Sequence, residues 1–331
     1  MNNKWLRRVS LLAVIFAWLV IGLGAFTRLK AAGLGCPDWP GCYGHVMPEG
    51  GSEKAWIEMI HRYCAGTLVL LIVVITFLSL LRVARQGGNL LLWCLLVFLM
   101  VIYQALLGMW TVTLKLWPIV VSQHLLGGMI ILALLWIIHL KSRDFRQRFI
   151  FAGRDKFFAV MALILVFSQI SLGAWTSTNY AGISCHDFPF CHWSQTMHYR
   201  IREAFNLMIP PGINYEGGVL NEVVRQTIQM VHRWGALVMS SYLIFLGIYL
   251  IIRYPNCFKL QRIILFMLIL LILQVILGIV NVVAQLPLVI AVMHNLFAAL
   301  LLVSVVSINF YILSASKVKE YGNAKLKYSY F

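Results

Sequence analysis

The chain has 331 residues, of which 61% are hydrophobic and only 11% are charged, and its formal net charge is +16. A soluble domain carries roughly 25% charged residues, so this composition excludes a soluble globular protein and indicates one embedded in a membrane. The basic excess would suit a nucleic-acid partner only if it gathered on one binding surface, and it is instead spread between apolar segments.

Eight apolar segments are long enough to cross the hydrocarbon core of a bilayer, which takes about 20 residues. In chain order they are roughly 9–27, 61–82, 89–112, 119–140, 157–176, 227–252, 263–283 and 289–313. The first is long for the apolar core of a signal peptide, and no small-residue cleavage site follows it. The sequence therefore predicts an all-α membrane protein with eight transmembrane helices.

Lysine and arginine are concentrated on one side of the predicted membrane. With eight spans both termini share a side, and that side carries 18 of the 27 bases but only three acids. The opposite side carries nine bases and eight acids. Because bases accumulate in cytoplasmic segments, we expect both termini to be cytoplasmic, membrane lipid to surround the chain, and no nucleic-acid partner. The absence of an Arg- and Ser-rich transit peptide favours a bacterial plasma membrane.

The sequence is a tandem repeat. GAFT at 24–27 recurs as GAWT at 173–176, an offset of 149 residues. Farther along, YQALLGM at 103–109 corresponds to LQVILGI at 273–279, where a longer second outer loop has increased the offset to about 170. Similarity at a fixed offset is the signature of a duplicated structural unit. Four histidines and four cysteines recur in the same order, which distinguishes this repeat from the general similarity of apolar helices.

Each repeated unit contains four of the predicted spans. We therefore expect two pseudo-symmetric four-helix bundles, an amino-terminal half at 1–141 and a carboxyl-terminal half at 157–316. A basic cytoplasmic linker at 142–156 joins them, and a cytoplasmic tail at 317–331 follows. Because four is an even number, both halves cross the membrane in the same orientation, as in parallel repeats related by an axis along the membrane normal.

Four of the nine histidines fall near the outer ends of alternate spans, at similar depth: His61, His124, His232 and His294. Ionisable residues in membrane helices are costly and usually face a bundle interior, where a single one can be a structural hydrogen-bonding group. Two per half favour bis-histidine haem, one porphyrin in each half, since haem iron takes axial imidazoles from facing helices. Zinc or copper is the weaker alternative, because no thiolate or carboxylate set in the helices completes a four-ligand site.

Two cysteine pairs share the spacing C-x5-C in the outer loops, Cys36 with Cys42 and Cys185 with Cys191. The outer compartment is oxidising, which favours a disulfide within each loop. The spacing is a poor match to zinc sites, whose paired cysteines have about two to four intervening residues. Whether either disulfide is structural or redox-active is open.

Several motifs together resemble the haem A synthase family, in its bacterial type with paired outer-loop cysteines. They are GAFTRLKAAGLGCPDWPGCYG at 24–44, EMIHR at 58–62, the four helix histidines and the loop cysteines. The resemblance extends from the first span to the eighth. It implies an oxidoreductase that converts the C8 methyl group of haem o to a formyl group, making haem a for terminal oxidases. Haem o synthase, the cytochrome oxidase assembly machinery and an unidentified electron acceptor are the partners that it implies.

The resemblance also assigns the two halves. It implies that haem b is a cofactor whose axial ligands are His232 and His294 in the carboxyl-terminal half. The substrate haem o is then held by His61 and His124 in the amino-terminal half. The outer loop at 177–225 has no counterpart in the first half, and no role is assigned to it.

The motifs EMIHR and QMVHR differ in their first residue, which is Glu58 in one and Gln229 in the other. On a helix, Glu58 lies on the same face as His61 and one turn nearer the outside. A carboxylate beside the substrate porphyrin can accept and return the protons that oxidation of a methyl group releases. We therefore assign Glu58 a catalytic role. The alternative is that it caps the first helical turn or pairs with Arg62.

Arg62 and Arg233 directly follow the two histidines of these motifs. At the outer interface a guanidinium can pair with a haem propionate. The alternative is an ordinary interfacial anchor.

Two other functions remain open from the sequence, a membrane dihaem b-type cytochrome in quinol electron transfer and a haem-binding transporter or chaperone. An electron carrier needs no acid three residues from a ligand, and a transporter is expected to have charged or broken helices at mid-membrane, of which these spans have few. The oxygen source and the oligomeric state are also open, a homo-oligomer included.

Overall fold

The computed structural model describes residues 3–48, 50, 52–86, 89–143, 149–185, 187–191 and 200–314, without the side chains of residues 3 and 82–89. The predicted tail and part of the predicted linker therefore lie outside the described residues.

Eight long helices run through the described residues, and each is long and apolar enough to cross a membrane. They are α1 (Asn3–Leu29), α2 (Glu53–Gln86), α3 (Asn89–Thr113), α4 (Pro118–Lys141), α5 (Gly153–Thr178), α7 (Glu222–Arg253), α8 (Phe258–Val283) and α9 (Leu288–Ser314). Two short helices, η1 (Ala181–Ile183) and α6 (Ile201–Ala204), lie between α5 and α7. The prediction of an all-α protein with eight spans is confirmed.

Two helices begin well before the apolar segments that predicted them. We expected spans from about 61 and 227, whereas α2 begins at Glu53 and α7 at Glu222. Polar caps start both helices in the outer region, since the Ser52 hydroxyl accepts from the Ala55 N–H at 3.4 Å and the Asn221 side chain accepts from the Val224 N–H at 3.0 Å. Polar residues can therefore be helical here beyond the hydrocarbon core, which an apolar window does not detect.

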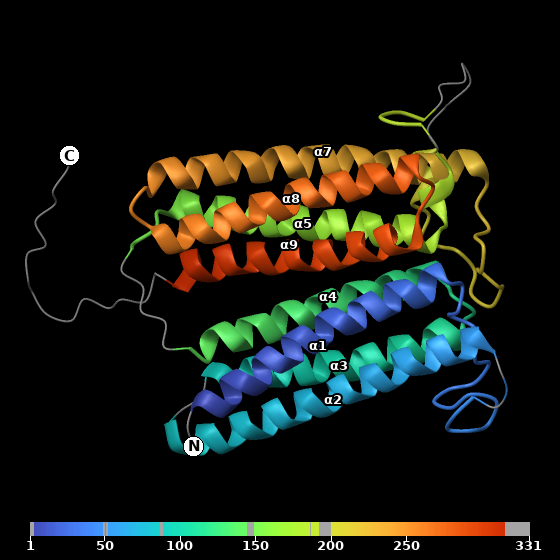
Figure 1. The fold of residues 1–331 in the computed structure, drawn as a ribbon, viewed down its shortest axis with the longest axis horizontal. Helices are drawn as coiled ribbons and strands as arrows, with labels where there is room; N and C mark the ends of the chain where they lie inside the picture. Colours follow the sequence, from blue (N-terminus) through green and yellow to red (C-terminus); the bar gives the residue numbers. More distant parts are fainter. Residues whose placement is uncertain are drawn as a thin grey trace, which may run out of the picture.

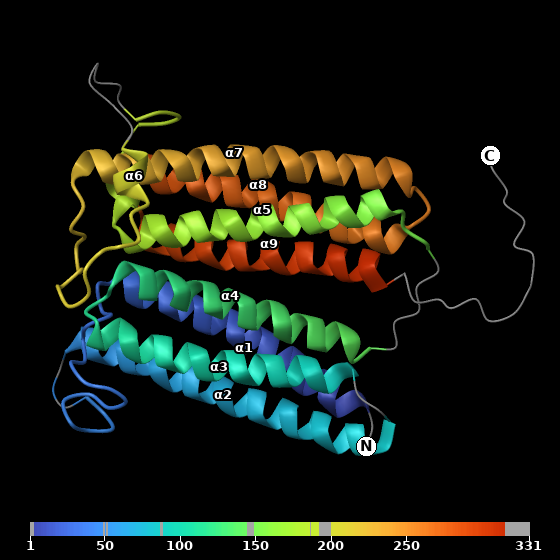
Figure 2. The same ribbon diagram turned by 180° about the vertical axis from the view of Figure 1, so that it is seen from behind.

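The helices form two groups of four that pack side by side (Figure 1). Helices α1 to α4 make up one group, and α5, α7, α8 and α9 make up the other, with α1, α4, α5 and α9 at the seam between them. The view from behind shows the same two groups (Figure 2). α1 begins and α9 ends at the same end of the assembly, as an even number of spans requires. The expected pseudo-symmetry of the groups stays a prediction.

The seam combines apolar packing with a few polar contacts. Buried leucines and isoleucines of α4 and α9 belong to one continuous core cluster that extends through both groups. The Trp136 indole donates to the Ser307 hydroxyl at 2.7 Å, and the Trp18 indole donates to the Leu296 carbonyl at 2.9 Å. Each bond joins a helix of the first group to α9, so α9 is the main partner of the first group.

The long outer loop of the second half lies against the outer end of the first half. The Tyr215 N–H donates to the Lys115 carbonyl at 3.1 Å, and the Trp117 indole donates to the Ile209 carbonyl at 3.1 Å. The side chain of Tyr215 is almost completely buried. This loop, which had no assigned role from the sequence, joins the two groups of helices at this end of the molecule.

Candidate functional site

Each of the four helix histidines packs against a glycine on a neighbouring helix. A Cβ atom built on the glycine would lie 3.1–3.3 Å from the imidazole Cε1 atom, closer than ordinary carbon contact. A side chain at these positions would therefore press on the ring, and glycine removes that obstacle. The pairs are Gly24 with His61, Gly108 with His124, Gly173 with His232 and Gly278 with His294.

The four glycines occupy equivalent places in the internal repeat. Gly24 and Gly173 begin the GAFT and GAWT motifs, and Gly108 and Gly278 lie within YQALLGM and LQVILGI. The sequence analysis used these motifs to detect the duplication and missed their glycines as site residues. The signal was present in the sequence, since each glycine recurs within a repeated motif, Gly24 at an offset of 149 residues and Gly108 at an offset of 170 residues.

The histidines come together in the two pairs that the repeat predicts. His124 interacts electrostatically with His61, and His232 does so with His294. The Nδ1 atoms of His61, His124 and His294 are buried and have no hydrogen-bond partner among the described residues. A buried nitrogen left in this way costs about 1–3 kcal/mol, so rings of this kind are suited to binding a ligand.

The surroundings of the histidines fit haem better than a tetrahedral metal site. The described residues contain no group of three or more His, Cys, Asp or Glu placed to hold a metal ion. A tetrahedral zinc site takes about four such ligands, whereas haem iron needs only two axial imidazoles from the protein. Two imidazoles on facing helices, each backed by a glycine, match the second requirement.

Among the described residues, glutamine side chains contact the imidazoles in the second half only. The Gln169 amide nitrogen lies 3.1 Å from Nδ1 of His232, and the Gln274 amide nitrogen lies 3.2 Å from Nε2 of His294. In the first half, Gln104 donates at 2.6 Å to the backbone carbonyl of His124 instead. Val20 stands at the position equivalent to Gln169. The two sites are therefore built on one plan but differ in the groups around their rings.

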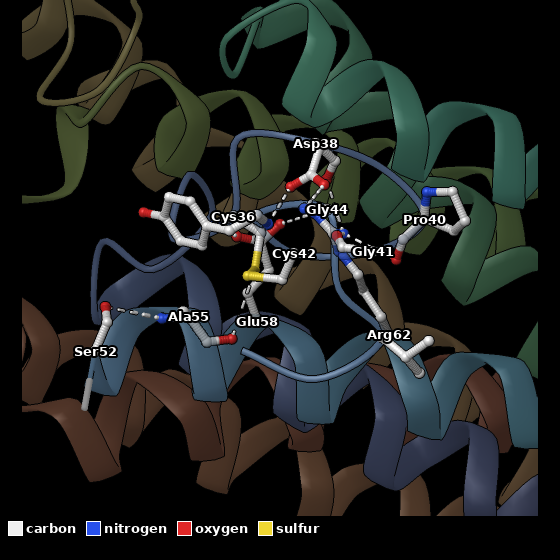
Figure 3. Close-up of a disulfide and its surroundings, with 12 residues drawn as sticks. Cys36, Asp38, Pro40, Gly41, Cys42, Gly44, Ser52, Ala55, Glu58 and Arg62 are labelled. Carbon is white, nitrogen blue, oxygen red and sulfur yellow. Dashed lines mark hydrogen bonds and ion pairs between the residues drawn. A yellow bond between two sulfur atoms is a disulfide. The ribbon is translucent and has the colours of Figure 1, made fainter. Parts of the chain in front are cut away.

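Glu58 is buried, with 4% of the residue exposed, and both its carboxylate oxygens are engaged. One oxygen pairs with Arg62 Nη2 at 2.5 Å, and the other accepts from the backbone N–H of Cys36 at 2.8 Å (Figure 3). The pairing with Arg62 that the sequence left open is present. The proposed capping of the first turn is wrong, because α2 begins at Glu53 and Glu58 lies beyond that turn.

Gln229 makes different contacts at the equivalent position of the second half. Its amide nitrogen donates to the Gly182 carbonyl at 3.0 Å, and its amide oxygen accepts from the Ser184 hydroxyl at 3.2 Å. Gln229 is as buried as Glu58, with 3% exposed. The position that Glu58 and Gln229 share in the repeat therefore holds a neutral amide as deeply buried as a carboxyl group. The acid is specific to the first half.

The two arginines bind the disulfide loops through equivalent carbonyl groups. Arg62 Nη1 donates to the carbonyls of Asp38 at 3.0 Å and Pro40 at 3.2 Å, and also to that of Gly41. Arg233 Nη1 donates to the carbonyls of Asp187 at 2.8 Å and Pro189 at 3.0 Å, which stand 149 residues later in the chain. Each arginine fixes an outer loop over its own half.

Both cysteine pairs form the expected disulfides. The Cα atoms are 4.8 Å apart in Cys36–Cys42 and 5.2 Å apart in Cys185–Cys191. Inside the first loop, the Asp38 carboxylate accepts from the backbone N–H groups of Tyr43 and Gly44 (Figure 3). The bond from Gly44 in particular holds the pKa of Asp38 below its usual value. The first loop is thus a compact, hydrogen-bonded cover next to Glu58.

The chain is similar in sequence to known proteins along most of its length. A family model described as COX15-CtaA, cytochrome oxidase assembly protein, matches residues 7–306. A protein named heme A synthase from Shewanella oneidensis is 42% identical over 94% of this chain and 97% of its own length. Proteins of the same name from Lysinibacillus sphaericus and Bacillus mycoides are 25% and 26% identical over 91% and 90% of this chain, and over 92% and 89% of their own lengths. The chain belongs to the COX15-CtaA family of cytochrome oxidase assembly proteins.

Proposed function

We propose that this chain is a haem A synthase, a membrane oxidoreductase that converts the C8 methyl group of haem o to a formyl group. The observation that carries the proposal is the histidine–glycine contact, repeated four times, together with an acid beside only one of the two pairs. Membership of the COX15-CtaA family and 42% identity to a protein named heme A synthase support this function over an electron-carrying cytochrome or a haem transporter.

The carboxyl-terminal half is the proposed haem b site, with His232 and His294 as axial ligands. Haem b supplies one-electron transfer when it is bound there. Gln169 and Gln274 contact these two rings and would restrict their rotation. Arg233 has a buried Nε atom with no hydrogen-bond partner among the described residues, which fits a donor to a haem propionate.

The amino-terminal half is the proposed haem o site, with His61 and His124 as axial ligands. Arg233 binds three loop carbonyls. Arg62 also binds three loop carbonyls and, in addition, the carboxylate of Glu58. Its main proposed task is therefore to hold the first loop and to orient the carboxylate of Glu58.

Glu58 is the proposed proton acceptor and donor during oxidation of the methyl group. Its carboxylate lies one turn from His61 on the same helix, in a buried position. Arg62 and the Cys36 N–H each take one lone pair on a different oxygen, so each oxygen keeps a second lone pair that can accept a proton. The electrons pass to an acceptor outside the chain, and we assign the haem b half the task of carrying them.

The proposed setting is a bacterial plasma membrane, with both termini in the cytoplasm and the disulfide loops outside. The charge distribution along the sequence supports this orientation. The disulfides also fit an oxidising outer compartment. The proposed partners are an enzyme that supplies haem o and the assembly pathway of a terminal oxidase that receives haem a. Self-association stays open.

The test is co-expression with a haem o-making enzyme in a host that makes no haem a, followed by extraction and chromatography of total haem. Haem a is expected with the wild-type chain, and haem o alone is expected with a His61→Ala, His124→Ala double variant. Haem o alone with the wild-type chain, present in the membrane at normal level and carrying haem b, would contradict the proposed activity.

A further inference from the structure

A cleft of about 620 Å³ opens at the inner end of the seam, the end at which α1 begins and α9 ends. Its walls come from α4 and the residues just after it, from the start of α8, and from the last part of α9. Figures 1 and 2 show α4 and α9 diverging toward this end. The cleft therefore lies between the two halves, far from the histidines and the disulfide loops.

The mouth of the cleft is strongly basic. Arg143, Lys259 and Arg262 line it and are exposed, and no acid is among the described residues that line it. Lys259 and Arg143 lie close enough to repel each other electrostatically. Three bases at one opening attract an anion to it.

The floor of the cleft is aromatic and apolar. Tyr311 is buried, and Trp136 and Phe310 are half-buried beside it. The Lys259 ammonium lies 5.7 Å from the centre of the Tyr311 ring. The basic mouth and the aromatic floor are therefore in direct contact. A ligand that fits must therefore be anionic at one end and apolar at the other.

We propose that this cleft binds the headgroup of an anionic phospholipid. Its phosphate would lie between Arg143, Lys259 and Arg262, and its glycerol and first acyl carbons would lie on the aromatic floor. The depth supports this choice, because the lining residues stand at the ends of membrane-spanning helices, where headgroups lie. Basic clefts between transmembrane helices at the cytoplasmic side are typical sites for such lipids. A bound headgroup would contact bases from both sides of the cleft and so join the end of α4 to α8.

The experiment compares the wild-type protein with two triple variants of equal charge change. The cleft variant carries Arg143→Gln, Lys259→Gln and Arg262→Gln. The control variant carries Arg7→Gln, Arg8→Gln and Arg154→Gln. These three exposed bases lie on the same side of the predicted membrane as the cleft but do not line it. Each full-length protein is reconstituted in nanodiscs of phosphatidylglycerol mixed with phosphatidylcholine, moved to detergent, and examined by native mass spectrometry for retained lipid.

We expect the wild-type and control proteins to retain phosphatidylglycerol in preference to phosphatidylcholine. We expect the cleft variant to retain about 100-fold less, because each of the three bases near a membrane surface contributes about a fivefold preference. Equal retention in all three proteins, or an equal loss in both variants, would overturn the site. If the cleft triple variant does not elute as a folded species in size exclusion, single Lys259→Gln is used, with a loss of severalfold expected.

A second arm distinguishes a lipid from a free anion. Inorganic phosphate at millimolar concentration is added to the detergent-solubilised wild-type protein before the measurement. We expect it neither to displace phosphatidylglycerol nor to raise the midpoint of thermal unfolding, because it has no apolar part to contact Trp136 and Phe310. Displacement by phosphate alone would show that the cleft is a simple anion site and would overturn the lipid assignment.

Discussion

The Cε1 atom of His232 lies 3.2 Å from the position that a Cβ atom on Gly173 would occupy. The same relation joins His61 to Gly24, at 3.1 Å, on the equivalent helices of the first half. A helix that must let an imidazole of its neighbour approach this closely has no room for a side chain at that point. Glycine in these helices thus sets the position of each candidate axial ligand.

Gly173→Ala is expected to weaken haem b binding. The added methyl group would move the His232 ring by a few tenths of an ångström, and overpacking of this kind typically costs about 1–3 kcal/mol. The measurement is the ratio of low-spin haem b absorbance to protein in the purified variant. We expect this ratio to fall severalfold.

Gly66→Ala is the matched control. A Cβ atom on Gly66, in helix α2, would meet no atom within 4 Å. The same substitution should therefore leave the haem b ratio unchanged. Equal losses in Gly66→Ala and Gly173→Ala would show that helix glycines as a class, and not the contact with His232, determine haem retention.

The sequence predicted the number of spans, the order of the histidines and the disulfide pairing, because each depends on residues that are recognisable one at a time. It missed the glycines, because the role of a glycine in an apolar helix can be inferred only when the side chains that pack against it are known. It also left Arg62 with a choice of partners. The bonds of Arg62 to Asp38, Pro40 and Gly41 join residues 21–24 positions apart, from the first turns of α2 to an irregular loop. The conformation of such a loop cannot be deduced from helical periodicity.

His232→Ala and His294→Ala are each expected to abolish the six-coordinate, low-spin haem b spectrum. Removing one imidazole leaves the iron with a single protein ligand, so the spectrum should become high-spin or disappear. The measurement is the optical and electron paramagnetic resonance spectrum of the purified variants. His61→Ala and His124→Ala are the controls and should keep the low-spin haem b signal. An intact signal in both variants of the second pair would assign haem b elsewhere.

Arg62→Gln is expected to make the Cys36–Cys42 disulfide easier to reduce. The substitution removes the guanidinium that binds three carbonyls of this loop, so the loop should open more often to an external thiol. The measurement is differential alkylation and mass mapping after a timed exposure to dithiothreitol. We expect the Cys36–Cys42 rate to rise severalfold and the Cys185–Cys191 rate to stay constant.

Arg233→Gln supplies the reciprocal control. Arg233 binds the second loop through the carbonyls of Asp187 and Pro189. Here the Cys185–Cys191 rate should rise and the Cys36–Cys42 rate should not. If each substitution accelerated both disulfides equally, the arginines would act on the whole outer surface and not on their own loops.

The charge distribution predicts that a reporter fused to the carboxyl terminus is active in the cytoplasm. The side that includes both termini carries 18 of the 27 bases, and such segments resist translocation. Green fluorescent protein, which fluoresces only inside, and alkaline phosphatase, which works only outside, are fused separately to the full chain. Phosphatase activity without fluorescence would reverse the topology and place the disulfide loops in the reducing compartment.

Glu58→Gln is expected to lower the yield of haem a by about 100-fold or more, the usual effect of removing a general acid–base group. The variant should fold, because Gln229 occupies the equivalent position of the second half with 3% exposure. A glutamine oxygen can still accept from the Cys36 N–H, so the loop keeps one of its two bonds to this residue. The measurement is the amount of haem a and of haem o, each divided by the amount of haem b, in the purified protein.

Two further variants separate the chemistry of Glu58 from its pairing with Arg62. Glu58→Asp keeps the carboxylate but shortens the reach to the guanidinium, and it should retain more haem a synthesis than Glu58→Gln. Gln229→Glu adds an acid to the second half and should leave haem a synthesis near the wild-type level, because that half carries electrons in our proposal. Normal haem a production by Glu58→Gln would instead assign Glu58 a purely structural role, as the residue that joins Arg62 to the Cys36–Cys42 loop.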